Sequence, residues 1–180
     1  MIYLVDKAKH LKIKNIEDKD IDRLVSLDND WQTSYYAQFH TRPVSKEEII
    51  SELKATKFPN AYWGIYQNDL LIGICTIGNV DLISSKCEIA ISLTSKNQNH
   101  GLGSLALRLL ITYIFDNLNL HKITLHVLSF NKAAIHVYEK LGFKRQGVLR
   151  EDAFKFGRYY DSYYYELLKS EWKNQKITSK

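Results

Sequence analysis

The sequence has few of the residues that build disulfide scaffolds, zinc sites or flexible linkers. Its 180 residues include only 2 cysteines, 2 prolines and 8 glycines. Two cysteines are too few for a disulfide framework or a Cys/His zinc site, and the 6 histidines lack the H-E-x-x-H spacing of a metalloprotease. We therefore expect no metal. The scarcity of proline and glycine indicates one continuous domain over residues 1–180.

Long apolar runs and blocks of like charge are also missing. No apolar run approaches the roughly 20 residues that span a bilayer, and the N-terminal segment reaches Asp6 too soon for a signal peptide. These features predict a cytoplasmic protein without a membrane partner. The net charge of +5 comes from scattered basic residues, whereas a nucleic-acid binder concentrates them on one face. We therefore expect no nucleic-acid partner.

The spacing of apolar residues predicts strands and helices in mixed order. Ser45, followed by acidic residues, is expected to cap the second helix. Gly142 is expected to end the last one in a left-handed conformation. The stretch 28–44 shows no clear period. Strands are predicted at 10–14, 61–66, 70–77, 87–93, 123–127, 148–154 and 159–167, and helices at about 15–27, 45–55, 102–117 and 134–141. This order predicts a mixed α/β (α+β) fold with helices packed around a central sheet.

One segment between a predicted strand and an amphipathic helix has the composition of a phosphate site. Gly101, Gly103 and Ser104 begin that helix, where glycines let a ligand approach the backbone and unpaired N–H groups favour anions. The same pair of glycines also suits a plain tight turn. A P-loop is absent. Ala106 is compatible with the dinucleotide fingerprint, but the hairpin-rich first half lacks the repeated βαβ units of that fold.

A second segment follows about thirty residues later and completes a recognisable arrangement. A Q-x-x-G-x-G turn, a strand, and then N-x-x-A-I-x-x-Y-x-K-x-G-F together resemble the GCN5-related N-acetyltransferases, the GNAT superfamily. Residues 87–89 and 147–161 resemble the branch that contains ribosomal-protein alanine and spermidine acetyltransferases. The resemblance extends from about Leu11 to Trp172. The residues that carry the two motifs are Gln98, Gly101, Gly103, Asn131, Tyr138, Gly142 and Phe143.

The resemblance implies the fold, the activity and the cofactor. It implies a mostly antiparallel twisted sheet of about six to seven strands, with a splayed central pair and about four flanking helices. It also implies an acetyl-CoA-dependent N-acetyltransferase that acts on a primary amine, either a protein N-terminus or a small molecule. The cofactor-binding residues would then be Ile91, Leu93, Gln98, Asn99, His100, Gly101, Leu102, Gly103, Ser104 and Asn131.

Two residues are the predicted catalytic groups. By the resemblance, Tyr138 is the general acid that protonates the departing thiolate. By its position alone, on the apolar side of its helix, Tyr138 fits a core aromatic better than an acid. Glu88 is the first candidate for the base that deprotonates the acceptor amine, and the alternative is a structural carboxylate paired with a basic residue. Asn99 stands where this family often has glycine.

The acceptor is expected to bind between the last hairpin and the loop 28–44, through Trp31, Tyr35 and Tyr36. No carboxylate lies between Trp31 and Arg42. Because a polyamine prefers acidic walls, this absence argues against a polyamine acceptor, although a spermidine acetyltransferase remains the specific enzyme variant. A non-catalytic acyl-CoA sensor of the same fold is the main alternative to an enzyme. The oligomeric state is open, with a homodimer as one option.

Overall fold

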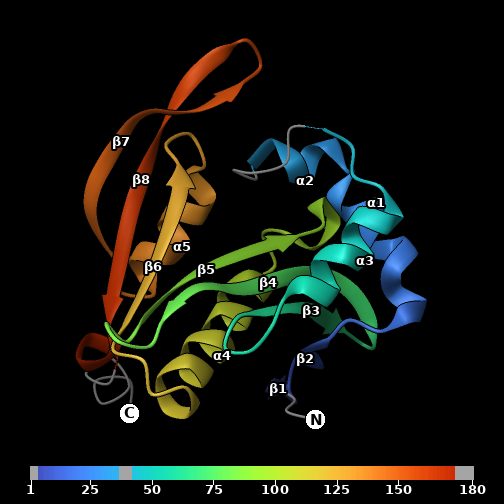
Figure 1. Cartoon of the computed structure of the whole chain (residues 1–180), viewed down its shortest axis with the longest axis horizontal. Coiled ribbons are helices and arrows are strands. Elements are labelled where there is room, and N and C mark those ends of the chain that lie inside the picture. The colour runs from blue at the N-terminus through green and yellow to red at the C-terminus, as the bar shows by residue number, and fades with distance from the viewer. Residues whose placement is uncertain (1–3, 37–41, 173–180) are drawn as a thin grey trace.

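A computed structural model of the chain describes residues 4–36 and 42–172. Its centre is an eight-stranded sheet of order β1-β2-β3-β4-β5-β6-β8-β7, with helices on both faces (Figure 1). The strands are β1 (Leu4–Asp6), β2 (Leu11–Asn15), β3 (Ala61–Gln67), β4 (Leu70–Asp81), β5 (Lys86–Leu93), β6 (Lys122–Leu128), β7 (Lys144–Lys155) and β8 (Arg158–Leu168). The helices are α1 (Ile21–Asp28), α2 (Trp31–Tyr36), α3 (Lys46–Ala55), α4 (Leu102–Asn117) and α5 (Lys132–Lys140), with short 3-10 turns at Asp18–Asp20 and Ser95–Asn97.

The strands and helices predicted from periodicity are confirmed in their type and order. Strand β1 and helix α2 were not predicted. Strand β1 is too short to show a period. Helix α2 lies in the stretch 28–44, which shows no clear period. Only Thr33 of its residues is buried, so the sequence has no apolar stripe that would indicate a helix. Its local start is fixed instead by Asp30, whose carboxylate accepts hydrogen bonds from the backbone N–H and hydroxyl of Thr33.

Alternating side chains on β3 and β4 divide the core into two layers. Ile65 and Ile72 pack with α4 on one face of the sheet, whereas Tyr66 and Leu71 pack with α1 and α3 on the other. This follows from the period of two in a strand, which sends successive side chains to opposite faces. Helix α4 has buried residues along its whole length and fixes the glycine turn at its N-terminus relative to the sheet.

Strands β5 and β6 are the parallel pair in a sheet whose other neighbours are antiparallel. They pair over only three positions, ending at Glu88 opposite Thr124. Beyond this point β5 stays paired with β4 as far as Leu93, and β6 stays paired with β8 as far as Leu128. The two strands therefore diverge (Figure 1), as the predicted splay requires.

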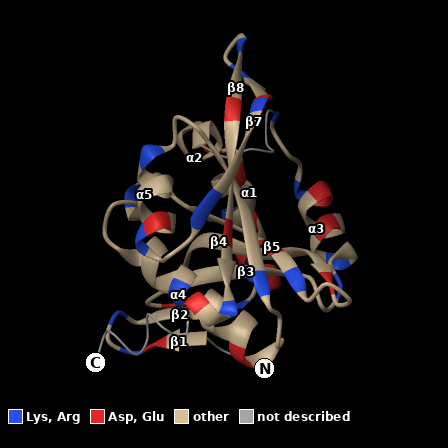
Figure 2. Ribbon diagram, turned by 90° about the vertical axis from the view of Figure 1, so that its left-hand side faces the viewer, with Lys and Arg blue, Asp and Glu red and all other residues tan. Residues whose placement is uncertain are grey.

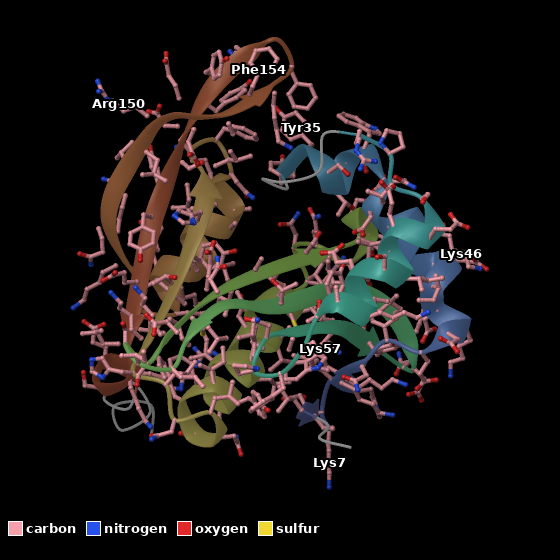
Figure 3. The ribbon with its side chains drawn as sticks, viewed as in Figure 1. Lys7, Tyr35, Lys46, Lys57, Arg150 and Phe154 are labelled. Atoms are coloured by element: carbon pink, nitrogen blue, oxygen red, sulfur yellow. The ribbon has the colours of Figure 1, made fainter. Side chains whose placement is uncertain are left out.

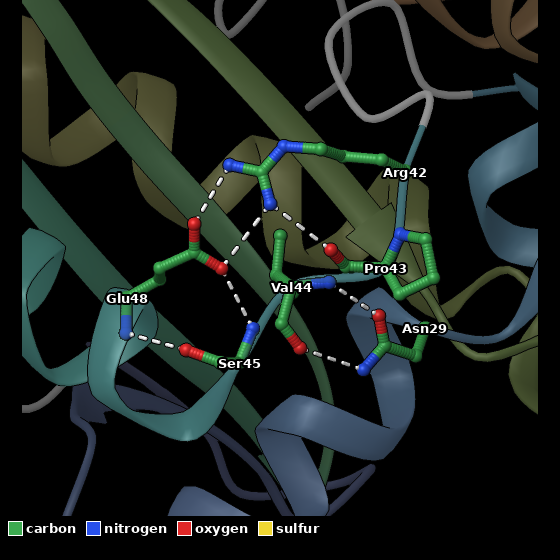
Figure 4. Close-up of polar contacts among 6 residues, drawn as sticks. All are labelled: Asn29, Arg42, Pro43, Val44, Ser45 and Glu48. Carbon is green, nitrogen blue, oxygen red and sulfur yellow. Dashed lines mark hydrogen bonds and ion pairs between the residues drawn. The ribbon is translucent and has the colours of Figure 1, made fainter.

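The segment that enters α3 is tied to the end of α1 (Figure 4). The Asn29 side chain bonds both the N–H and the C=O of Val44, at 2.8 and 2.9 Å. Arg42 lies against Glu48 at 2.7 Å. Glu48 and Ser45 form a capping box at the start of α3, which confirms the predicted cap. These contacts hold α1 and α3 together beside the diverging strands.

The outer edges of the sheet are irregular or short. Strand β1 has three residues. Strand β7 shifts register against β8 twice, between Arg145 and Gly147 and between Leu149 and Ala153.

Basic and acidic residues are interspersed along the elements that face the viewer in Figure 2. Among the described residues, no helix is long and apolar enough to cross a membrane.

The central position of α4 gives a stability prediction. Leu110 is fully buried in the core, so Leu110→Ala should lower the free energy of unfolding by about 3 kcal/mol through lost burial and a residual cavity. Leu70→Ala is the matched control, because Leu70 is 51% exposed and its loss should change stability by less than about 0.5 kcal/mol. Urea denaturation followed by circular dichroism measures both. Equal effects would contradict the placement of α4.

Candidate active site

The turn before α4 presents an open backbone. Gly101 caps the helix with φ of 75° and supplies no side-chain hydrogen bond to the first N–H groups. A Cβ placed on Gly101 would meet no atom within 4 Å, so the space beside it is free. Asn99 has φ of 62°, a conformation that asparagine tolerates better than most residues, which explains how it occupies a glycine position. Gln98 folds back and donates to the carbonyl of Leu93 at 2.9 Å.

This turn suits a phosphate-bearing ligand. The unpaired N–H groups and the dipole of a 16-residue helix favour an anion at this end. A cleft runs from the turn along the free edge of β5 to α5. Eight of the ten predicted cofactor residues line it, namely Ile91, Leu93, Gln98, Asn99, Gly101, Gly103, Ser104 and Asn131.

Two predicted cofactor residues have side chains outside the cleft. Leu102 is 5% exposed and packs in the core, because it begins the buried stripe of α4. His100 is exposed and does not line the cleft. The cleft also has walls on β5, α4 and α5 that the motif did not predict. These walls include Ser92, Leu107, Ala133, Ala134, His136 and Val137.

Asn131 and Tyr138 lie where the cleft meets a second pocket. The side-chain oxygen of Asn131 accepts a hydrogen bond from the Ala134 N–H at 3.1 Å and so caps α5. Tyr138 is 7% exposed, and its ring packs edge-on against Phe143. Burial raises the pKa of Tyr138 to about 12. Its hydroxyl therefore keeps its proton at neutral pH, as a general acid must.

The second pocket opens on the other side of the splay and contains Glu88. One Glu88 oxygen lies 2.9 Å from Nδ1 of His126, and the other accepts a hydrogen bond from Asn79 at 2.9 Å. Both Glu88 and His126 line the pocket together with Tyr138. The motifs did not identify His126. Its only sequence signal is a polar residue between the apolar residues Leu125 and Val127.

This second pocket is acidic. Asp28 from α1, Glu52 from α3 and Glu88 from β5 all line it. The pKa of Tyr62, which lines the same pocket, lies above its ordinary value because of burial and then because of the negative charges of Asp28 and Glu52. Among the described residues that line the pocket there is no Lys or Arg. The pocket therefore favours a positively charged ligand.

The predicted acceptor residues divide between this pocket and an adjoining aromatic cleft. Tyr36 lines the acidic pocket. Trp31 and Tyr35 line the adjoining cleft, which shares Asp28 with the pocket. Figure 3 shows Tyr35 facing the hairpin tip that carries Phe154, and Tyr35 stacks on Phe156 at 4.9 Å. Residues 37–41 of the predicted acceptor loop lie outside the described residues.

The hairpin tip is fastened to α2 by a buried lysine. Lys155 is 6% exposed and donates a hydrogen bond to the backbone carbonyl of Ser34 at 2.9 Å. Burial lowers the pKa of Lys155. Because it is engaged with the backbone and lines the aromatic cleft rather than the acidic pocket, it leaves the acidic character of the pocket intact.

The cleft beside the α4 turn and the acidic pocket share Asn131 and Tyr138 and lie where β5 and β6 cease to pair. The family model of the acetyltransferase (GNAT) domain matches residues 10–144. The chain therefore belongs to the GNAT family, and it is an N-acetyltransferase, as the sequence motifs predicted.

The relatives of the chain include enzymes with different acceptors. YdaF of Bacillus subtilis (strain 168), whose name assigns it provisionally as a ribosomal N-acetyltransferase, is 28% identical over 176 residues, which cover 93% of this chain and 96% of YdaF. A spermidine N(1)-acetyltransferase of Vibrio cholerae is 35% identical over 105 residues, 58% of this chain and 61% of that protein.

The structural comparison gives the same family. The crystal structure of a spermidine N-acetyltransferase from Vibrio cholerae in complex with CoA and spermine has a TM-score of 0.85 and 27% identity to this chain. The match covers 92% of this chain and 99% of the Vibrio cholerae chain. Its bound CoA supports acetyl-CoA as the co-substrate of the fold. In the described part of this chain, no three His, Cys, Asp or Glu side chains gather as a metal site requires.

The open turn gives a binding prediction. Gly101→Ala should weaken CoA binding about tenfold, because a left-handed alanine costs roughly 1–2 kcal/mol and distorts the turn. Gly78→Ala is the control: its Cβ also meets nothing within 4 Å, but its φ is not positive. Isothermal titration calorimetry with CoA measures both. Equal affinities for the two variants would show that the turn does not hold the cofactor.

Proposed function

We propose that this enzyme acetylates a primary amine of a substrate that carries a second positive charge, as a diamine or polyamine does. The observation that carries the proposal is the set of three carboxylates, Asp28, Glu52 and Glu88, in one pocket without a lysine or arginine among its described walls. A neutral peptide backbone or sugar gains little from such a wall, whereas a dication gains from every carboxylate. The spermidine acetyltransferases among the relatives agree with this choice.

The stretch between Trp31 and Arg42 carries no carboxylate, but the pocket does not depend on that stretch for its charge. The acidic residues come instead from α1, α3 and β5. The aromatic cleft next to the pocket adds apolar surface that suits the methylene chain of a long amine.

The reaction follows from the two connected pockets. Acetyl-CoA would lie along β5 with its pyrophosphate on the α4 turn and its thioester near Tyr138. The amine nitrogen, entering from the acidic pocket, attacks the acetyl carbon, and the C–S bond breaks. The free edge of β5 at Ile91–Leu93 offers backbone N–H groups to the oxyanion. Tyr138 gives its proton to the departing sulfur.

The domain organisation, the location and the partners of the chain are also proposals. One continuous sheet supports a single domain over residues 1–180, with its core at about 11–172. The predictions from the sequence also include a cytoplasmic location and the absence of a metal, of a membrane partner and of a nucleic-acid partner. The oligomeric state is open, with a homodimer as one option.

A matched pair of amines tests the acceptor. Putrescine and butylamine have the same chain length, but only putrescine carries a second charge. We expect kcat/KM at least about tenfold higher for putrescine, measured by thiol release from acetyl-CoA. A preference for free peptide N-termini over both amines would overturn the proposal.

The charge of the pocket has its own variants. Glu52→Gln should raise KM for putrescine about three- to tenfold with little change in kcat, because it removes one attractive charge. Glu47→Gln on the same helix is the control, since Glu47 does not line the pocket. The difference between the two should shrink at high salt. Equal KM values for both variants would contradict the role of Glu52.

Removal of the Tyr138 hydroxyl tests the chemistry. Tyr138→Phe should lower kcat about 100-fold or more while CoA affinity stays the same, because the thiolate loses its proton donor. Tyr113→Phe provides the control: Tyr113 is also buried but packs against Trp63, away from both pockets. If kcat falls equally in the two variants, the loss comes from packing and not from acid catalysis.

A further inference from the structure

The splay places one histidine and one carboxylate in direct contact at the mouth of the acceptor pocket. His126 lies two residues beyond Thr124, the last residue of β6 that pairs with β5, so it points to the same face of the strand as Thr124. Its Nδ1 lies 2.9 Å from Glu88, and both side chains are about three-quarters buried, with relative exposures of 25% and 23%. On the other side, the Tyr164 ring of β8 lies 5.0 Å from the imidazole.

This contact fixes which nitrogen carries the proton. An ionised carboxylate can only accept, so Nδ1–H donates to Glu88 and Nε2 keeps its lone pair. Asn79 donates to the other Glu88 oxygen and holds the carboxylate in place. Both Glu88 oxygens are thus engaged, whereas the described residues supply no hydrogen bond to Nε2 of His126. The nitrogen that remains available in the pocket belongs to the imidazole.

We infer that His126 is the catalytic base of the reaction and that Glu88 is its positioning residue. The inference rests on the proposed function, since it needs an amine acceptor in this pocket. An acceptor amine is mostly protonated at pH 7 and must lose a proton before it can attack. Imidazole titrates nearer to neutral pH than a carboxyl group, and it is therefore the better proton acceptor.

The protons of the reaction balance with two groups. The ammonium gives one proton to Nε2 of His126, which returns it to solvent after turnover. The neutral nitrogen then forms the C–N bond, the C–S bond breaks, and Tyr138 protonates the sulfur. The nitrogen loses its second proton, which restores the Tyr138 hydroxyl directly or through water. The net products are an acetamide, a thiol and one proton released.

Titratable groups face His126 from several elements that line the pocket or pack against the imidazole. They are Glu88 on β5, Tyr164 on β8, Asp28 on α1, Tyr36 on α2, Glu52 on α3, Tyr62 on β3 and Tyr138 on α5. Glu88→Gln removes the carboxylate that orients the imidazole, so it should lower kcat more than it raises KM.

The deciding experiment compares two acceptors on His126→Gln. One is putrescine, and the other is its β,β-difluorinated form, whose amine next to the CF2 group is largely neutral at pH 7.5. His126→Gln should lower kcat/KM for putrescine about 100-fold, remove the acidic limb of the pH profile, and lower kcat/KM for the fluorinated amine less than about tenfold. Tyr138→Phe should lower both equally, because each reaction releases the same thiolate.

Controls separate folding from chemistry. His121→Gln, an exposed position just before β6, should leave activity unchanged, and thermal melting with CoA titration checks that His126→Gln folds and binds the cofactor. Equal losses with both amines, or a retained acidic limb, would overturn the assignment of His126 while leaving the N-acetyltransferase intact. If the wild-type enzyme releases no thiol with any amine, the proposed function fails and the base fails with it.

Discussion

The divergence of β5 from β6 is the constraint on which the site depends. A sheet normally satisfies every backbone N–H and C=O of its inner strands. Here pairing stops at Glu88 and Thr124, and the free edge of β5 is left for a ligand. The surrounding ladders hold this arrangement, because β4 anchors β5 and β8 anchors β6 over the rest of their lengths. The enzyme therefore needs a gap in the pairing of β5 with β6, and each of these strands is held by its other neighbour.

The acceptor pocket shows how the fold brings together charge that the sequence spreads out. Asp28, Glu52 and Glu88 come from three elements, and their acidity is visible only after folding. The end of α1 and the start of α3 are held together by the Asn29–Val44 and Arg42–Glu48 contacts (Figure 4). A small network of exposed bonds thus sets the relative position of the helices that carry two of the three charges.

The sequence predicted the fold and the donor side more completely than the acceptor side. The predicted cofactor residues Gln98, Gly101 and Gly103 follow one another within a single strand–turn–helix, so they form one short motif that resembles the motif of the family. Leu102 also belongs to the apolar stripe of α4, so its side chain turns into the core and not into the cleft. The acceptor pocket has no contiguous pattern. His126 meets Glu88 across 38 positions of chain, and no local periodicity reports such a contact.

The two outer strands carry a consequence for how the protein behaves at high concentration. An exposed strand edge is a template for association with other chains. Here β1 offers only three residues, and β7 interrupts its ladder twice and carries the exposed charges of Lys144, Arg145, Arg150 and Glu151. Continuation of the sheet into a second molecule is thus disfavoured at both ends. The sheet can therefore keep the gap between β5 and β6 while its edge strands, β1 and β7, do not promote aggregation.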